Sequence, residues 1–489
     1  MTQNVSTSKK GRILSRTFMN VDFVLRSPLC ISGDGEKTDN DVMRDGSGNP
    51  FIPGSSLAGA LRDYMTSRFS QGEANLLFGS IADEARQSPL IVSDGIIAAP
   101  IISVRDGVAL DDGKQTIENA KYDMEIVEYG AKGSLNLELV LRDNHGFDLE
   151  KAKVWISALL IALDKNDIQL GMKKTRGFGL IQMTKLSMRH FDFDKKQSSL
   201  DESQAESYLE FLNNGFMMNL DELKGDGITA AELEALNNWK GALEAEAKDF
   251  KSIYDEIVVP LRLEGGLSIR QYSAQPEAPD FQHIQSRNVS VVPGTSWTGA
   301  LRHRMKRILQ ELGVDAEKSE DEMNLIFGTL SSEEQPGFAS PVRIYESRRD
   351  NAELSASKEK LILSTRTKIN RFTGGAQDKA LFTERMSVGG EYCLVIRMRK
   401  SFTFPKASDD EREKTTANLL KGHKGLFYLA IKDLCNGFLQ VGGQTSIGRG
   451  LFSYAGENAE AVFSPQDEKE CLKALAERVQ ELRKPIMSN

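Results

Sequence analysis

The sequence has few of the residues that build metal centres, and those it has are scattered. Its four cysteines, Cys30, Cys393, Cys435 and Cys471, form no C-x-x-C pair, and its five histidines show no metal-ligand spacing. These absences exclude a zinc ribbon and a disulfide framework, and they are typical of a protein from a reducing compartment. We therefore expect a cytoplasmic protein.

Long apolar runs and an excess of basic charge are also lacking. No apolar run approaches the length of a membrane span, and the N-terminal MTQNVSTSKKGR has no apolar signal core, so we expect no membrane association. Lys and Arg total 62 against 70 Asp and Glu, a net charge of −8. This balance argues against general attraction to nucleic acid but allows a local basic face. At 489 residues, the chain is long enough for two or more large domains.

One stretch occurs twice. FIPGSSLAGALRDYM (51–65) returns as VVPGTSWTGALRHRM (291–305), with identical residues at a constant offset of 240. A second echo comes later in each copy, where Gly171, Gly177 and Gly179 correspond to Gly442, Gly448 and Gly450 at an offset of 271. Self-similarity of this kind predicts a duplicated domain. The larger second offset indicates insertions in the second copy.

Each copy has the order β–α–β–β–α–β with a hairpin-like insertion, which predicts an α+β fold with a ferredoxin-like (RRM-like) sheet. We predict a flexible arm over 1–15, a first domain over 16–191 and a second over 257–489 with a C-terminal helix. Acidic residues dominate 192–256, which we interpret as a helical connector. Its helices would pack on a neighbouring subunit or cover an edge, so that deleting 200–250 loosens assembly.

The repeated turn has legible local chemistry. Pro-Gly ends a strand, Ser55 or Ser56 can cap a helix, and the following apolar spacing predicts that helix. Exposed N–H groups at such a helix start suit phosphate, although a capped core helix is the simpler alternative. Basic residues among glycines in the second echo suit a sugar-phosphate chain. We expect RNA contacts from Gly54, Ser55, Ser56, Arg62, Lys173, Lys174, Arg176, Gly294, Thr295, Ser296, Arg302, Arg366, Lys368 and Arg449.

Together these motifs resemble the RAMP superfamily, the backbone subunits of type III CRISPR effector complexes. The residues that carry the resemblance are DNDVMRDGSGNPFIPGSSLAGALR (39–62), LFG (77–79) and LGMKKTRGFG (170–179), with VVPGTSWTGALR, IFG, TGGAQDKALFTE (373–384) and VGGQTSIGRG in the second copy. It covers nearly all of the chain outside the acidic connector. Two such domains in one chain look like the fused double subunit of type III-D-like complexes.

The resemblance implies two RAMP domains that line up along a CRISPR RNA, each with a hairpin thumb that interrupts the guide–target duplex. It also implies that a loop aspartate, with Mg²⁺ or another divalent metal, cuts the complementary target RNA. The family's D-x-x-V-x-x-D loop places that aspartate at Asp39, also the expected metal ligand. Asp41 is a weaker catalytic candidate, and Asp45 fits a turn. The expected partners are CRISPR RNA, target RNA and other subunits of such an antiviral complex.

The second copy departs from this pattern, because its loop QYSAQPEAPDFQHIQSRN lacks D-x-x-V-x-x-D. Asp280 lies 13 residues before Pro293, against 14 from Asp39 to Pro53, and is a candidate for a second cutting aspartate that His283 and Arg287 could assist. Two alternatives stay open. The chain could be a non-catalytic scaffold that holds guide RNA, or a nuclease that processes the precursor repeat, for which no His, Tyr or Lys cluster is visible.

Overall fold

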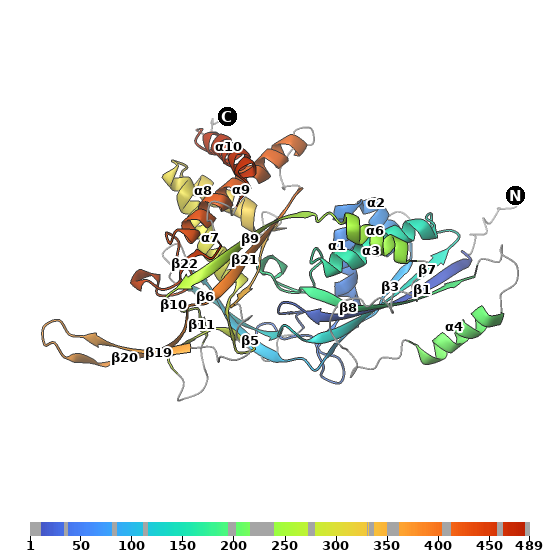
Figure 1. The fold of residues 1–489 in the computed structure, drawn as a ribbon, viewed down its shortest axis with the longest axis horizontal. Coiled ribbons are helices and arrows are strands. Elements are labelled where there is room, and N and C mark those ends of the chain that lie inside the picture. The colour runs from blue at the N-terminus through green and yellow to red at the C-terminus, as the bar shows by residue number, and fades with distance from the viewer. Residues whose placement is uncertain are drawn as a thin grey trace, which may run out of the picture. The chain divides into compact units, whose positions relative to one another are not determined.

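The structure is a computed structural model of the chain (Figure 1). It describes residues 11–33, 38–80, 86–110, 116–193, 202–215, 239–271, 279–329, 331, 337–349, 361–402, 412–456 and 463–484. Contacts divide the chain into two compact units. The first comprises Met1–Val104, Met124–Met172 and Gly179–Ile253, and the second comprises Arg105–Asp123, Lys173–Phe178 and Tyr254–Asn489.

The first unit is built on an antiparallel sheet in ferredoxin-like order. β8 (Ile181–Asp192) pairs with β1 (Ile13–Leu25), β1 pairs with β7 (Lys132–Arg142), and β7 pairs with β3 (Leu90–Val92) and β4 (Gly95–Ala98). β4 also pairs with the short β2 (Phe51–Ile52). Helices α1 (Gly54–Arg68), α2 (Gln71–Phe78) and α3 (Leu149–Asp164) gather on one face (Figure 1).

Alternation along β1 explains this layering. Thr17, Met19, Val21 and Phe23 are buried, whereas Arg16 and Phe18 on the other face are only partly covered. Successive side chains of a strand point to opposite faces, so one face joins the helices in a core. The apolar stretch 154–163 within α3 supplies Trp155, Leu159 and Leu160 to that core. The predicted α+β, β–α–β–β–α–β arrangement is therefore confirmed for the first copy.

The acidic segment contributes to the first unit in two places. Leu243 of α6 (Lys240–Asp249) and Trp239, its N-cap residue, are buried in the first core, and α6 packs on α3. α4 (Glu202–Asn214) places Phe211 4.7 Å from Phe18, on the opposite face of the sheet. The segment is therefore more than a connector, and deleting 200–250 would also remove core residues of the first unit. Leu233 and Leu236, whose spacing with Trp239 and Leu243 fits one helical face, lie outside the described residues.

The second unit repeats the sheet. β17 (Val342–Ile344), β21 (Glu391–Arg399), β9 (Tyr254–Glu264) and β22 (Leu451–Tyr454) pair in that order, all antiparallel. Its helices are α7 (Gly294–Glu311), α8 (Ala316–Phe327), α9 (Arg412–Cys435) and α10 (Pro465–Leu482). The polar stretch 267–290 is not a plain loop, since it contains β11 (Arg270–Gln271), β12 (Phe281–His283), β13 (Gln285–Ser286) and the start of β14 (Val289–Val292).

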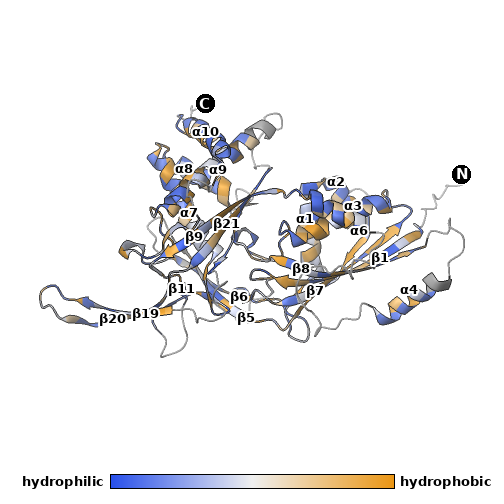
Figure 2. Cartoon of the chain, viewed as in Figure 1, coloured by the Kyte–Doolittle hydropathy of each residue, from blue (hydrophilic) through white to orange (hydrophobic). Residues whose placement is uncertain are grey.

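Each copy carries the expected hairpin. Hairpin 1 consists of β5 (Ile102–Leu110) and β6 (Thr116–Val127), and hairpin 2 of β19 (Leu361–Ile369) and β20 (Ala376–Val388). Hairpin 2 projects from the second unit as a two-stranded ribbon (Figure 1), and most of it is hydrophilic (Figure 2). No helix in the described part of the chain is both long and apolar enough to cross a bilayer.

Candidate nucleic-acid and cleavage site

The repeated turn begins its helix one step earlier than expected and without a serine cap. α1 and α7 start at Gly54 and Gly294, their N-cap residues are Pro53 and Pro293, and neither has a side-chain cap hydrogen bond from that position. The prediction of Ser55 or Ser56 as the cap is therefore wrong. Instead the Gly54 N–H donates to Asp94 Oδ1 at 2.7 Å. This carboxylate occupies one of the N–H groups proposed for phosphate and complements the helix dipole.

Close packing explains the glycine in this turn. A Cβ at Gly54 would lie 2.4 Å from the Val92 carbonyl oxygen, and one at Gly294 would lie 2.3 Å from the Arg176 carbonyl oxygen. Ser55 and Thr295 are exposed, and Ser56 and Ser296 are partly exposed. The hydroxyl groups are thus the part of the turn that remains accessible to a ligand.

The arginine of the repeated helix has the same structural contact in both copies. Arg62 Nη2 donates to Asn75 Oδ1 at 2.6 Å, and Arg302 Nη2 donates to Asn324 Oδ1 at 3.0 Å. Arg302 also pairs with Glu320. Each asparagine lies three residues before the end of the following helix, so the arginine ties two helices together. RNA binding by Arg62 and Arg302 stays a prediction, and the geometry gives both a packing role.

The glycine-rich loops of the two copies have the same backbone. Gly171, Gly177 and Gly179 have φ of 74°, 85° and 78°, and Gly442, Gly448 and Gly450 have φ of 90°, 80° and 70°. These are left-handed conformations that glycine adopts without steric cost. Lys173 and Gln444 occupy matching left-handed positions with φ of 55° and 58°. The second echo therefore reflects one loop conformation built twice.

The left-handed residue of each loop binds a hairpin. Lys173 Nζ donates to Tyr122 Oη of β6 at 2.6 Å. Gln444 Nε2 donates to Glu384 Oε1 of β20 at 3.1 Å, and Gln444 Oε1 accepts from Arg366 Nη2 of β19 at 2.5 Å. Arg366 also pairs with the buried Glu384 at 2.6 Å. The sequence had pointed to Lys173 and Arg366 only as RNA ligands. Tyr122, Gln444 and Glu384 were missed, although Gln444 matches Lys173 at the offset of 271.

A buried ion pair holds hairpin 1 within the second unit. Arg105 of β5 pairs with Glu346, and both side chains are almost fully buried. The Arg105 guanidinium also lies 5.7 Å from the centre of the Phe178 ring. Glu346 occupies the position in the second copy that corresponds to Asp94 in the first. The acidic residue at this position therefore caps a helix in the first copy and binds an arginine in the second. Sequence reasoning missed this pair, because nothing local marks Arg105 as buried.

The first aspartate loop separates its two catalytic candidates. Asp39 is exposed, whereas Asp41 is buried and its Oδ1 accepts from the Thr38 N–H at 2.9 Å and the Thr38 hydroxyl at 2.7 Å. Asp41 therefore shapes the loop. Glu125 of β6 accepts a hydrogen bond from Arg44 Nη2 of the same loop at 2.9 Å and so fastens the loop to β6. Asp45 accepts from two backbone N–H groups, of Ser47 and Asn49, as expected of a turn residue.

The second loop places Asp280 where the first places Asp39. Asn40 forms a parallel bridge with Met124 of β6, and Phe281 forms a parallel pair with Glu384 of β20. Asp39 and Asp280 each precede the bridged residue by one position. Asp280 is also exposed, and its Oδ2 accepts from the Thr383 N–H at 2.7 Å and the Thr383 hydroxyl at 3.0 Å. These bonds, the backbone one foremost, lower the pKa of Asp280 and keep it ionised.

The histidine proposed to assist Asp280 is inaccessible. His283 is completely buried, and its Nδ1 accepts from the Ile269 N–H at 3.1 Å. Burial lowers the pKa of His283 to about 3, so the ring is neutral. It therefore cannot exchange protons with a ligand at the surface, and its suggested role is wrong. Arg287 is exposed in a left-handed turn with φ of 49°.

The remaining basic candidates differ in accessibility. Lys368 on hairpin 2 is exposed, whereas Lys174 and Arg449 are only partly so. Arg176 is also only partly exposed, and its partial burial, with the nearby charge of Arg302, lowers its pKa. Arg176 lies against the start of α7 through its carbonyl oxygen. Within the described ranges, no group of three or more His, Cys, Asp or Glu side chains could hold a metal ion.

The RAMP superfamily matches residues 22–182 and 278–453, more than half of the sequence. Among solved structures, a chain from the type III-B Cmr-beta complex bound to cognate target RNA matches with 16% identity and a TM-score of 0.30. The match covers 36% of this chain and 61% of that one. The search of curated proteins gave no match.

Proposed function

Because the chain belongs to the RAMP superfamily, we propose that it is a backbone subunit of a type III CRISPR ribonucleoprotein, similar to the fused double subunits of type III-D-like systems. It binds CRISPR RNA and cleaves complementary target RNA beside its hairpins. The observation that carries the proposal is the matched placement of Asp39 and Asp280. Each carboxylate lies on a loop that pairs with the second strand of a hairpin, β6 for Asp39 and β20 for Asp280.

The hairpins suit contact with a guide–target duplex. On hairpin 2 the exposed side chains include Lys368 and Arg371, and also Ile369, Phe372 and Phe382. Cationic groups attract phosphates, and aromatic faces stack on bases. A hairpin that enters the duplex would hold the target backbone beside the aspartate loop. The glycine-rich loops keep each hairpin in place through Lys173 and Gln444.

The proposed chemistry uses the 2′-hydroxyl of the target as nucleophile. Held in line with the adjacent phosphate, it forms a 2′,3′-cyclic phosphate and releases a 5′-hydroxyl strand. The aspartate carboxylate orients the reacting group and assists removal of its proton. Mg²⁺ is commonly held by one or two carboxylates together with substrate phosphates. Asp39 fits that habit as a single exposed carboxylate, with RNA supplying the other ligands, and the bound ion would stabilise charge on the phosphate.

The test is a map of cleavage positions on target RNA by the assembled complex, with and without Mg²⁺. We expect Asp39→Ala to remove one set of cuts and Asp280→Ala another, with cyclic phosphate ends. A 5′-phosphate product would exclude the proposed nucleophile.

A non-catalytic scaffold is the second candidate. This role is favoured by four basic side chains that form hydrogen bonds within the protein and thus have structural roles: Arg62, Lys173, Arg302 and Arg366. Unchanged cleavage in both aspartate variants, with guide RNA still bound, would assign the chain to this role.

A further inference from the structure

We propose that Thr383, on β20 of hairpin 2, is the positioning residue for Asp280. The cut that depends on Asp280, called the second cut, then depends on the hairpin in a way that the Asp39-dependent first cut does not. This inference rests on the proposed cleavage of target RNA. It adds Thr383, which lies within the TGGAQDKALFTE stretch (373–384) but has no local feature that marks it as a partner of Asp280.

The contact between the two residues is a closed ring. The Thr383 N–H and hydroxyl both donate to Asp280 Oδ2, at 2.7 and 3.0 Å, and the hydroxyl oxygen accepts from the Asp280 N–H at 3.2 Å. The hydroxyl thus uses both its donor and its acceptor capacity on one residue. The three bonds engage Oδ2 and the backbone and leave Oδ1 outside the ring. The exposed carboxylate is therefore fixed in orientation and still presents an oxygen to a ligand.

The ring connects Asp280 to the rest of the site. Thr383 is followed on β20 by Glu384, which is buried and bound by Gln444 of the glycine-rich loop and by Arg366 of β19. Glu384 also pairs with Phe281, the residue after Asp280. Loop, hairpin and glycine-rich turn therefore meet at two consecutive residues of one strand. Displacing hairpin 2 displaces the Asp280 carboxylate with it.

The first copy lacks the hydroxyl at this place. Because Asn40 bridges Met124 as Phe281 pairs with Glu384, the position of Thr383 corresponds to Asp123. An aspartate has no hydroxyl that both donates and accepts, so Asp123 cannot form the ring that Thr383 forms with Asp280. Thr365 offers a matched control, since it is the cross-strand partner of Thr383 on β19 and is exposed.

The experiment uses the reconstituted ribonucleoprotein and an end-labelled target RNA, so that both cuts are measured in each reaction. Thr383→Val keeps the side-chain shape and removes the hydroxyl. We expect the Asp280-dependent cut to slow by roughly tenfold or more, since misplacing a reacting group is costly. The Asp39-dependent cut stays unchanged in the same molecules. Thr383→Ser restores the second cut, and Thr365→Val leaves both cuts at wild-type rates.

A pH series adds a readout that a purely structural defect would not move. The Thr383 hydroxyl contributes, after the Thr383 backbone N–H, to the lowered pKa of Asp280. Removing the hydroxyl should therefore shift the acid limb of the second cut, and only that limb, to higher pH. Wild-type rates at both positions for Thr383→Val would overturn the inference and leave the proposed function intact. Unchanged cuts in Asp280→Asn, with one lost in Asp39→Asn, would also overturn it. If neither aspartate variant alters any cut, the proposed function itself fails.

Discussion

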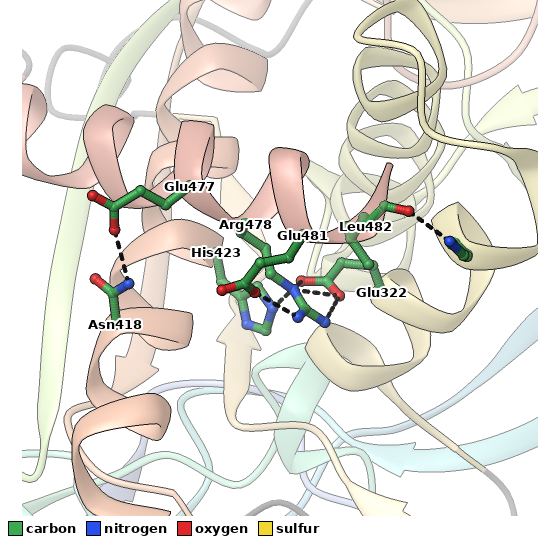
Figure 3. Close-up of polar contacts among 8 residues, drawn as sticks. Glu322, Asn418, His423, Glu477, Arg478, Glu481 and Leu482 are labelled. Carbon is green, nitrogen blue, oxygen red and sulfur yellow. Dashed lines mark hydrogen bonds and ion pairs between the residues drawn. The ribbon is translucent and has the colours of Figure 1, made fainter. Parts of the chain in front are cut away.

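The buried carboxylate of Glu322 allows a quantitative test of how the helical layer of the second unit is held together. Glu322 lies on α8 and is almost completely buried (Figure 3). It accepts from Arg478 Nη2 of α10 at 2.8 Å, and His423 Nε2 of α9 lies 2.8 Å from its Oε1. One carboxylate thus joins three helices. Glu322→Gln keeps the shape of the side chain and removes its charge.

Two lines of reasoning give the same magnitude. Burial alone would raise the pKa of Glu322, but the hydrogen bonds and charges of His423 and Arg478 more than offset it and lower the pKa to about 2. Relative to the ordinary value of 4.5, this corresponds to about 3 kcal/mol of stabilisation of the ionised form. Breaking a buried ion pair by removing one partner costs about 3–5 kcal/mol. We therefore expect Glu322→Gln to lower the free energy of unfolding of this layer by about 3 kcal/mol.

Hydrogen exchange measured by mass spectrometry can resolve this layer from the first unit. A loss of about 3 kcal/mol raises the opening equilibrium on the order of 100-fold, so amides in α9 and α10 should exchange correspondingly faster. Glu477→Gln is the matched control, because Glu477 is exposed and accepts a hydrogen bond from the neutral Asn418 side chain (Figure 3). It should change exchange very little. Equal effects of the two substitutions would refute the reasoning.

The same carboxylate predicts a pH dependence. A carboxyl group whose pKa is lowered by folding stabilises the fold above its unfolded pKa of 4.5. That contribution is lost as the pH falls from about 4.5 through about 2, where the folded group protonates. We expect the difference between wild type and Glu322→Gln to persist from pH 7 to pH 5 and to shrink below that. A constant difference down to pH 2 would contradict this assignment.

Two further substitutions test the framework of the site, and urea unfolding measures the first. Gly450→Ala should destabilise the second unit by more than about 4 kcal/mol, because the new Cβ would lie 1.8 Å from the Val441 carbonyl oxygen. Gly448→Ala is its control and should cost about 1–2 kcal/mol, because a Cβ at Gly448 meets open space and only the left-handed φ is unfavourable. Arg105→Met leaves the buried Glu346 without its partner and should speed amide exchange across 102–127, whereas the exposed Lys368→Met should not; unchanged exchange would deny the pair a role in holding hairpin 1.

Local patterns in the sequence were sufficient to predict the duplicated architecture. Apolar spacing marked α1 and α7, because burial of one helix face imposes that period on the chain. The two glycine echoes predicted one loop built twice, and all six glycines have positive φ. Acidic composition, in contrast, suggested a separate connector. Trp239 and Leu243 instead joined the first core, since burial depends on which face finds a partner.

The site was predicted as a set of residue types, and its pairings were not. Charge alone made Lys173, Arg302 and Arg366 look like phosphate ligands, yet the fold brings a tyrosine or carboxylate to each of them. Spacing from Pro293 did not decide whether Asp280 is the counterpart of Asp39. The parallel pairing of Phe281 with Glu384 gives Asp280 the position in its copy that Asp39 has in the first.

The two copies, their order of elements and the aspartate loop follow from residues close together along the chain, and they could therefore be predicted from the sequence. The folded arrangement was needed to show which basic side chains are bound within the protein, why His283 is inaccessible and what holds Asp280. Those contacts join residues as far as 103 positions apart, as Asp280 and Thr383 are. A hydrogen bond depends on distance and direction in space, and no local pattern encodes which distant strand will supply the partner.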